Sequence, residues 1–112
     1  MPQIIYAPEF ISDFERVYAF LAEKNPSAAQ RLAKLLNEKL ELLSSIPKAF
    51  PFFGEFRIYL LEFGSSVYAL LYDYDEELNR ISLLRIKHQK EAGFAWYTNQ
   101  AYKTKIDLNT QR

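Results

Sequence analysis

Three consecutive strands between residues 56 and 88 constrain the fold of this chain more than any other feature. All three runs are rich in aromatic, aliphatic and β-branched residues, which favour strands. They are Phe56–Phe63, Val67–Tyr74 and Arg80–His88. The turn formers Gly64–Ser66 separate the first two runs, and the polar stretch Asp75–Asn79 separates the last two. The pattern predicts a three-stranded antiparallel meander.

A short strand and a helix are predicted before the meander. Gln3–Ala7 is apolar enough for a strand, and Pro8 suits the first turn of a helix because its missing N–H has no partner there anyway. From Phe10 to Leu21 the apolar residues recur in steps of three and four, which places them on one stripe. The charged residues of this helix, Asp13 among them, fall mostly outside the stripe and are expected to face water.

A second helix follows at once. Asn25 can cap free backbone N–H groups, Pro26 suits the first helical position, and an apolar stripe then continues to about Ser45. A connection this short forces neighbouring helices to lie antiparallel. We therefore expect an α+β fold in which an N-terminal strand, an antiparallel helical hairpin and a three-stranded antiparallel meander build around one sheet.

Both faces of the predicted sheet are apolar. Phe56, Ile58 and Leu60 alternate with Tyr59 and Leu61, and the next run alternates in the same way. A helical hairpin covers only one face, so the other face needs a second cover, either the chain's own tail or another polypeptide.

The connection between the hairpin and the meander, residues 47–54, is broken by two prolines and a glycine but carries three phenylalanines. We expect these phenylalanines to plug one end of the core; a docking patch is the alternative.

Composition excludes several classes of function. The 112 residues fit one domain, predicted at residues 1–93 with a tail at 94–112, and 14 basic residues balance 14 acidic ones. With one histidine and no cysteine, the chain lacks the usual metal ligands, a thiol nucleophile and disulfides. Glycine-rich phosphate loops are absent, so no cofactor is expected. No signal peptide or membrane span is apparent, and a cytoplasmic protein without membrane contact is expected.

One cluster of positive charge stands out near the end of the meander. Arg80, Arg85, Lys87, His88 and Lys90 occur with no acidic residue among them. Strand alternation places Arg85 and Lys87 on one face and His88 and Lys90 toward the other. The cluster fits either an edge strand guarded by charge or an anion site.

Six segments in this order resemble the RelE/ParE superfamily of bacterial toxins, over residues 3 to 91. They are Tyr6–Glu9, Asn25–Leu32, Leu43–Pro47, Arg57–Leu60, Tyr68–Asp75 and Ile86–Glu91. The resemblance implies the toxin of a type II toxin–antitoxin system, of the plasmid-stabilisation type, which arrests growth when free. Its cognate antitoxin would wrap across the surface and supply the second cover of the sheet.

The residues favour the ParE-like branch, whose members poison DNA gyrase, over the RelE-like branch, whose members cut messenger RNA on the ribosome. RelE-like nucleases depend on clustered basic side chains, and two of the corresponding positions here are Ala69 and Gln89. Arg57 is kept, but Tyr59 replaces its basic partner. Losing most of that set removes charge stabilisation and proton transfer, so we expect a binding protein rather than an enzyme.

The alternative stays open at this point: a ribosome-dependent endoribonuclease acting on mRNA with Arg57, Arg85, His88 and Lys90 as catalytic residues. A third possibility is a domain that has lost its toxicity. Eight residues are the candidate contacts with a target or antitoxin. They are Arg57, Tyr59, Arg85, Lys87, His88, Lys90, Phe94 and Trp96.

Overall fold

The computed structural model of the protein describes residues 1–91, and the predicted tail with Phe94 and Trp96 lies outside the described residues. Two helices and five strands follow one another along the chain. They are β1 (Gln3–Tyr6), α1 (Pro8–Lys24), α2 (Pro26–Ser45), β2 (Phe52–Phe53), β3 (Phe56–Phe63), β4 (Ser66–Asp75) and β5 (Arg80–His88). The α+β class and the order of strand, helical hairpin and meander are confirmed.

All five strands belong to one mixed sheet with the spatial order β1-β5-β4-β3-β2. β3, β4 and β5 form the predicted antiparallel meander, whereas β1 lies parallel to β5 and pairs only with Arg80–Leu83. Tyr59, Leu70 and Ile86 share one row across the three central strands. The register shifts between Leu71 and Tyr72, which leaves Leu84 as an extra residue in β5.

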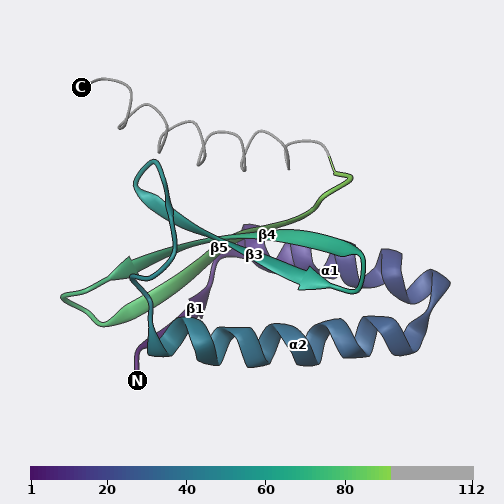
Figure 1. The fold of residues 1–112 in the computed structure, drawn as a ribbon, viewed down its shortest axis with the longest axis horizontal. Coiled ribbons are helices and arrows are strands. Elements are labelled where there is room, and N and C mark those ends of the chain that lie inside the picture. Colours follow the sequence, from purple (N-terminus) through teal and green to yellow (C-terminus); the bar gives the residue numbers. More distant parts are fainter. Residues whose placement is uncertain (92–112) are drawn as a thin grey trace.

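The two helices lie on the same face of the sheet (Figure 1). α1 begins at Pro8, and Asn25 separates it from α2. The Asn25 side chain accepts a hydrogen bond from the Ala28 amide at 3.2 Å, which confirms the predicted N-cap. No described helix is long and apolar enough to cross a membrane.

The main core lies between the helices and the inner face of the sheet. Leu32, Leu43, Leu61 and Leu70 are fully buried there. Tyr72 is equally buried, and its hydroxyl donates a hydrogen bond of 2.8 Å to the carbonyl of Pro47. Burial raises the pKa of Tyr72 to about 12 despite the opposing charge of Arg57, so this hydroxyl stays protonated.

The outer face of the sheet is apolar, as predicted, and only part of it is exposed. Ile58, Ala69 and Leu71 are buried, and Phe53 packs against the first two. Leu60, on the same face of β3, leaves 47% of its surface exposed.

The connection between α2 and β3 differs from the prediction in one respect. Instead of remaining irregular, Phe52 and Phe53 form the short strand β2, which pairs with Arg57 and Phe56. Phe50 does plug the end of the core, because its ring meets Tyr59 edge to face at a centroid distance of 4.8 Å. Phe52 is 51% exposed and joins neither core cluster.

Candidate functional site

A buried carboxylate joins the first helix to the end of the last strand. β1 covers β5 only as far as Leu83, so the following backbone groups on that edge need other partners. Asp13 of α1 provides one: its Oδ2 accepts hydrogen bonds from the Ile86 amide at 3.1 Å and from Arg85 Nε at 2.7 Å. Its Oδ1 accepts a bond from Arg85 Nη2 at 3.0 Å. The guanidinium of Arg85 is thus held in a two-pronged ion pair.

Arg16 extends this network to Glu91. One nitrogen of Arg16 contacts Asp13 Oδ1 at 3.2 Å, and two others contact Glu91 Oε2 at 2.7 and 3.1 Å. Glu91 Oε1 accepts a hydrogen bond from the His88 amide at 2.9 Å. Two carboxylates therefore occupy positions where an added strand would pair with β5, which closes this edge of the sheet to strand addition.

The expectation that Asp13 faces water is wrong, since only 2% of its surface is exposed. Asp13 lies three residues after Phe10 and four before Val17, which places it on the apolar stripe of the helix. That spacing was the signal that could have identified it. Glu91 was also not predicted as a site residue, because nothing in its local sequence indicates that it accepts a hydrogen bond from a strand amide.

Burial by itself would raise the pKa of Asp13. The hydrogen bonds from Arg85, from the Ile86 amide and from Arg16 outweigh burial and hold the pKa below its usual value. The carboxylate therefore remains charged at neutral pH and balances Arg85.

His88 is held by hydrogen bonds through both ring nitrogens. Its Nδ1 accepts a bond from the Lys90 amide at 3.0 Å, so the proton of the neutral ring lies on Nε2, which is 3.2 Å from the Ser66 hydroxyl oxygen. The ring meets Tyr68 edge to face at 5.0 Å. Burial lowers the pKa of His88, the Lys90 charge adds to the effect, and Glu91 opposes it. His88 is therefore a neutral side chain that shapes the end of the meander.

Arg57 lies on the opposite face of the sheet from Arg85. Arg57 is opposite Tyr72 in the register, whereas Arg85 is opposite Leu71. Arg57 Nη1 donates hydrogen bonds to the carbonyls of Lys48 and Phe50 at 3.0 and 2.8 Å. The guanidinium also stacks over the ring of Phe52 at 3.9 Å. Arg57 thus holds the connection that precedes β3.

The positively charged cluster does not converge on one point. Lys87 pairs with Ala69 on the outer face, while His88 pairs with Tyr68 on the inner face and Lys90 follows the end of β5. Lys90 is exposed and Lys87 partly so. Within residues 1–91, no group of three or more His, Cys, Asp or Glu side chains is placed to hold a metal ion.

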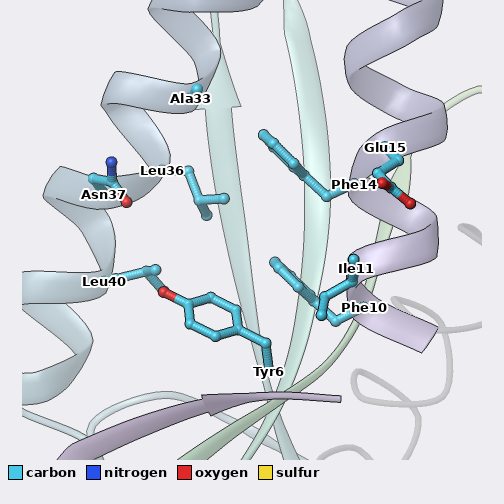
Figure 2. A pocket seen from close by; sticks show the side chains of 9 residues that line it. All are labelled: Tyr6, Phe10, Ile11, Phe14, Glu15, Ala33, Leu36, Asn37 and Leu40. Atoms are coloured by element: carbon cyan, nitrogen blue, oxygen red, sulfur yellow. The ribbon is translucent and has the colours of Figure 1, made fainter. Parts of the chain in front are cut away.

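Two grooves flank α1. The first, with a volume of about 260 Å³, lies between α1, α2 and β1. Figure 2 shows Tyr6 rising from β1 with its hydroxyl toward Leu40, while Phe10, Ile11 and Phe14 project from α1. This groove is mostly apolar, with Glu15 and Asn37 as its polar lining residues.

The second groove has a volume of about 530 Å³ and lies where the second half of α1 meets the ends of β4 and β5. Its lining combines apolar and charged side chains. They are Arg16, Val17, Phe20, Leu21, Lys24, Ser66, Tyr68, His88, Lys90 and Glu91. We call it the α1–β5 groove. The described surface therefore offers one mostly apolar groove and one groove of mixed lining beside α1.

Comparison with known proteins relates the chain to a family of toxins. Residues 4–93 match the family model described as the ParE toxin of type II toxin-antitoxin system, parDE. A solved structure, a metal-bound toxin from Helicobacter pylori, shares 17% sequence identity with a TM-score of 0.48. The match covers 82% of this chain and 99% of that chain. No curated protein sequence matches the chain.

Proposed function

Because the chain belongs to the ParE toxin family of type II toxin–antitoxin systems, we propose that it arrests growth by inhibiting DNA gyrase and that a cognate antitoxin neutralises it. The protein acts by binding and not as an enzyme. It works in the cytoplasm, where gyrase and the antitoxin are found, and residues 1–93 form the toxin domain while residues 94–112 form a tail.

The observation that carries the proposal is that three of the four side chains of the nuclease alternative, all except Lys90, already have partners within the fold. Arg85 is paired with Asp13, and Arg57 is bound to two backbone carbonyls and stacked on Phe52. Both nitrogens of His88 have partners. Cleavage of RNA requires free charge at the phosphate and a group that moves protons, and an arrangement in which these groups hold the fold supports binding instead.

Lys87 and Lys90 are the foremost contact candidates for the target, because their ammonium groups form no hydrogen bond or ion pair within the described residues. Arg57, Tyr59, Arg85 and His88 remain further contact candidates, although Arg57, Arg85 and His88 already have partners within the fold. Phe94 and Trp96 remain candidate contacts with the antitoxin.

One measurement in cells and one with purified proteins test the proposal. In cells, induction without the antitoxin should cause growth arrest with a DNA-damage response. With purified proteins, adding the toxin to gyrase should inhibit supercoiling. Mapping transcript ends in the same cells identifies the alternative, because a ribosome-dependent nuclease leaves new ends within codons. Supercoiling that is unaffected by the toxin would exclude gyrase as its target.

A further inference from the structure

The α1–β5 groove has an apolar floor. Val17 and Leu21 of α1 line it together with Tyr68 of β4. Phe20 stands at its margin with 61% of its surface exposed, the largest such fraction among the aromatic side chains of the described residues. An aromatic ring of this exposure beside an apolar floor is typical of an interface anchor.

The rim of this groove carries positive charge. Lys24 holds its ammonium 4.6 Å from the centre of the Phe20 ring, and Lys90, which also lines the groove, is exposed. Arg16, another lining residue, leaves 47% of its side chain exposed. The groove is therefore lined by three cations and one exposed aromatic ring, and Lys24 lies against that ring.

Glu91 is the only carboxylate among the described residues that line the groove, and it offsets the charge of Arg16 rather than that of Lys24 or Lys90. Glu91 Oε2 is bound by Arg16, and Glu91 Oε1 is bound by the His88 amide. Because both oxygens are occupied within the fold, the outward charge of the groove comes from Lys24 and Lys90. His88 adds no charge, since its neutral ring is fixed between Ser66 and the Lys90 amide.

We infer that the α1–β5 groove binds an acidic, apolar segment of the antitoxin, with apolar side chains on Phe20 and carboxylates against Lys24 and Lys90. This inference rests on the proposed function. Charge complementarity selects an acidic partner segment, and the aliphatic floor selects a polypeptide, since Val17 and Leu21 offer nothing to a phosphate backbone. The volume of about 530 Å³ accommodates a few side chains, so the groove is one anchoring point of a longer interface.

The test uses the full-length toxin and the full-length protein encoded by the adjacent reading frame as the antitoxin. Binding is measured for the wild type, for the double variant Lys24→Glu/Lys90→Glu and for Phe20→Ala. The control Arg31→Glu/Lys34→Glu makes the same change of charge on α2, outside the groove. We expect the Kd to rise at least about tenfold for each groove variant and to change by less than about threefold for the control.

Two further comparisons separate charge from packing. The effect of Lys24→Glu/Lys90→Glu should shrink when the salt concentration rises from roughly 50 to 500 mM, whereas that of Phe20→Ala should persist. Replacing acidic residues of the antitoxin with lysine should restore binding to the charge-reversed toxin. Equal affinity of the wild type and both groove variants would overturn the inference while leaving the proposed function intact. If the adjacent protein does not bind the wild-type toxin at all, both fail.

Three other occupants of the groove, instead of the antitoxin, can be detected with the free toxin. Trp96 is the single tryptophan of the chain, so its fluorescence reports on the chain's own aromatic segment. An emission shift caused by Phe20→Ala without antitoxin would assign the groove to that segment. A dimer that Phe20→Ala dissociates in sedimentation would assign it to a second copy. Binding of a single-stranded oligonucleotide that the double variant abolishes would assign it to nucleic acid. Each of these results would overturn the inference.

Discussion

Asp13 and Arg85, 72 residues apart in the chain, form a two-pronged ion pair with distances of 2.7 and 3.0 Å. Asp13 is 3% exposed at its side chain, whereas Arg85 is 35% exposed, so the carboxylate is the buried partner. The pair fixes α1 against the part of β5 that β1 does not reach. It links the helical hairpin to the strand that carries three of the candidate contacts, Arg85, Lys87 and His88.

Replacing Asp13 with alanine should lower the free energy of unfolding by about 2–4 kcal/mol, because the Ile86 amide and Arg85 lose their acceptor inside the fold. Urea unfolding followed by circular dichroism measures the change. Glu15→Ala is the matched control on the same helix, since Glu15 is exposed, and it should change stability by less than about 0.5 kcal/mol. Equal stability of the two variants would show that the Asp13 pair contributes little.

Asp13 should also make the protein sensitive to acid. Its folded pKa lies below the ordinary value of 3.8, so the unfolded chain takes up this proton first as the pH falls. The stability that Asp13 contributes is thus complete above about pH 4 and is lost as the pH falls through the folded pKa. Urea unfolding at several values between pH 6 and pH 2 should give a flatter profile for Asp13→Asn than for the wild type. Parallel profiles would contradict the assignment.

His88 should titrate below its ordinary pKa of 6.5, since burial disfavours its charged form. It is the single histidine of the chain, so its ring protons can be followed by NMR without assignment. In urea the same signal should titrate near the ordinary value. The stability from neutral His88 is complete above about pH 6.5 and decreases as the pH falls toward the folded pKa. A folded pKa at or above 6.5 would show that burial does not disfavour the charged ring.

The sequence was sufficient for most of the fold because its signals are local. Pro8 and Asn25 mark helix starts, and alternation along β3 and β4 separates the two faces. β2 escaped prediction because two residues carry no periodicity, and Pro51 argues against a strand beside them. The pairing of Phe52 with Arg57 depends on the turn between β2 and β3, which a two-residue strand does not predict.

The candidate site was less predictable, since a charged residue's partner is set by tertiary structure. The sequence shows the positively charged cluster from Arg85 to Lys90. It does not show that Asp13 forms an ion pair with Arg85. Asp13 can reach the backbone of β5 because β1 is short and ends before β5 does. The same positive charges were therefore compatible with an anion site or with a structural pair until the strand edge was known.

Arg85 and Lys87 lie on the same strand, and their alanine variants should fail in different ways. Arg85→Ala should destabilise the fold by about 2–4 kcal/mol, because it leaves the buried Asp13 carboxylate without its main partner. Lys87→Ala should keep stability within about 0.5 kcal/mol, since the ammonium has no partner among the described residues. If Lys87 contacts gyrase, its loss should weaken inhibition of supercoiling by about three- to tenfold.

Gyrase supercoiling assays and circular dichroism on the same samples separate these effects. Lys34→Ala on α2 is the control for removing an exposed cation, and it should match the wild type in both measurements. Inhibition by Lys87→Ala that equals the wild type would remove Lys87 from the target surface. A stable Arg85→Ala variant with weak inhibition would instead give Arg85 a direct contact with the target, because loss of the fold could then no longer explain its defect.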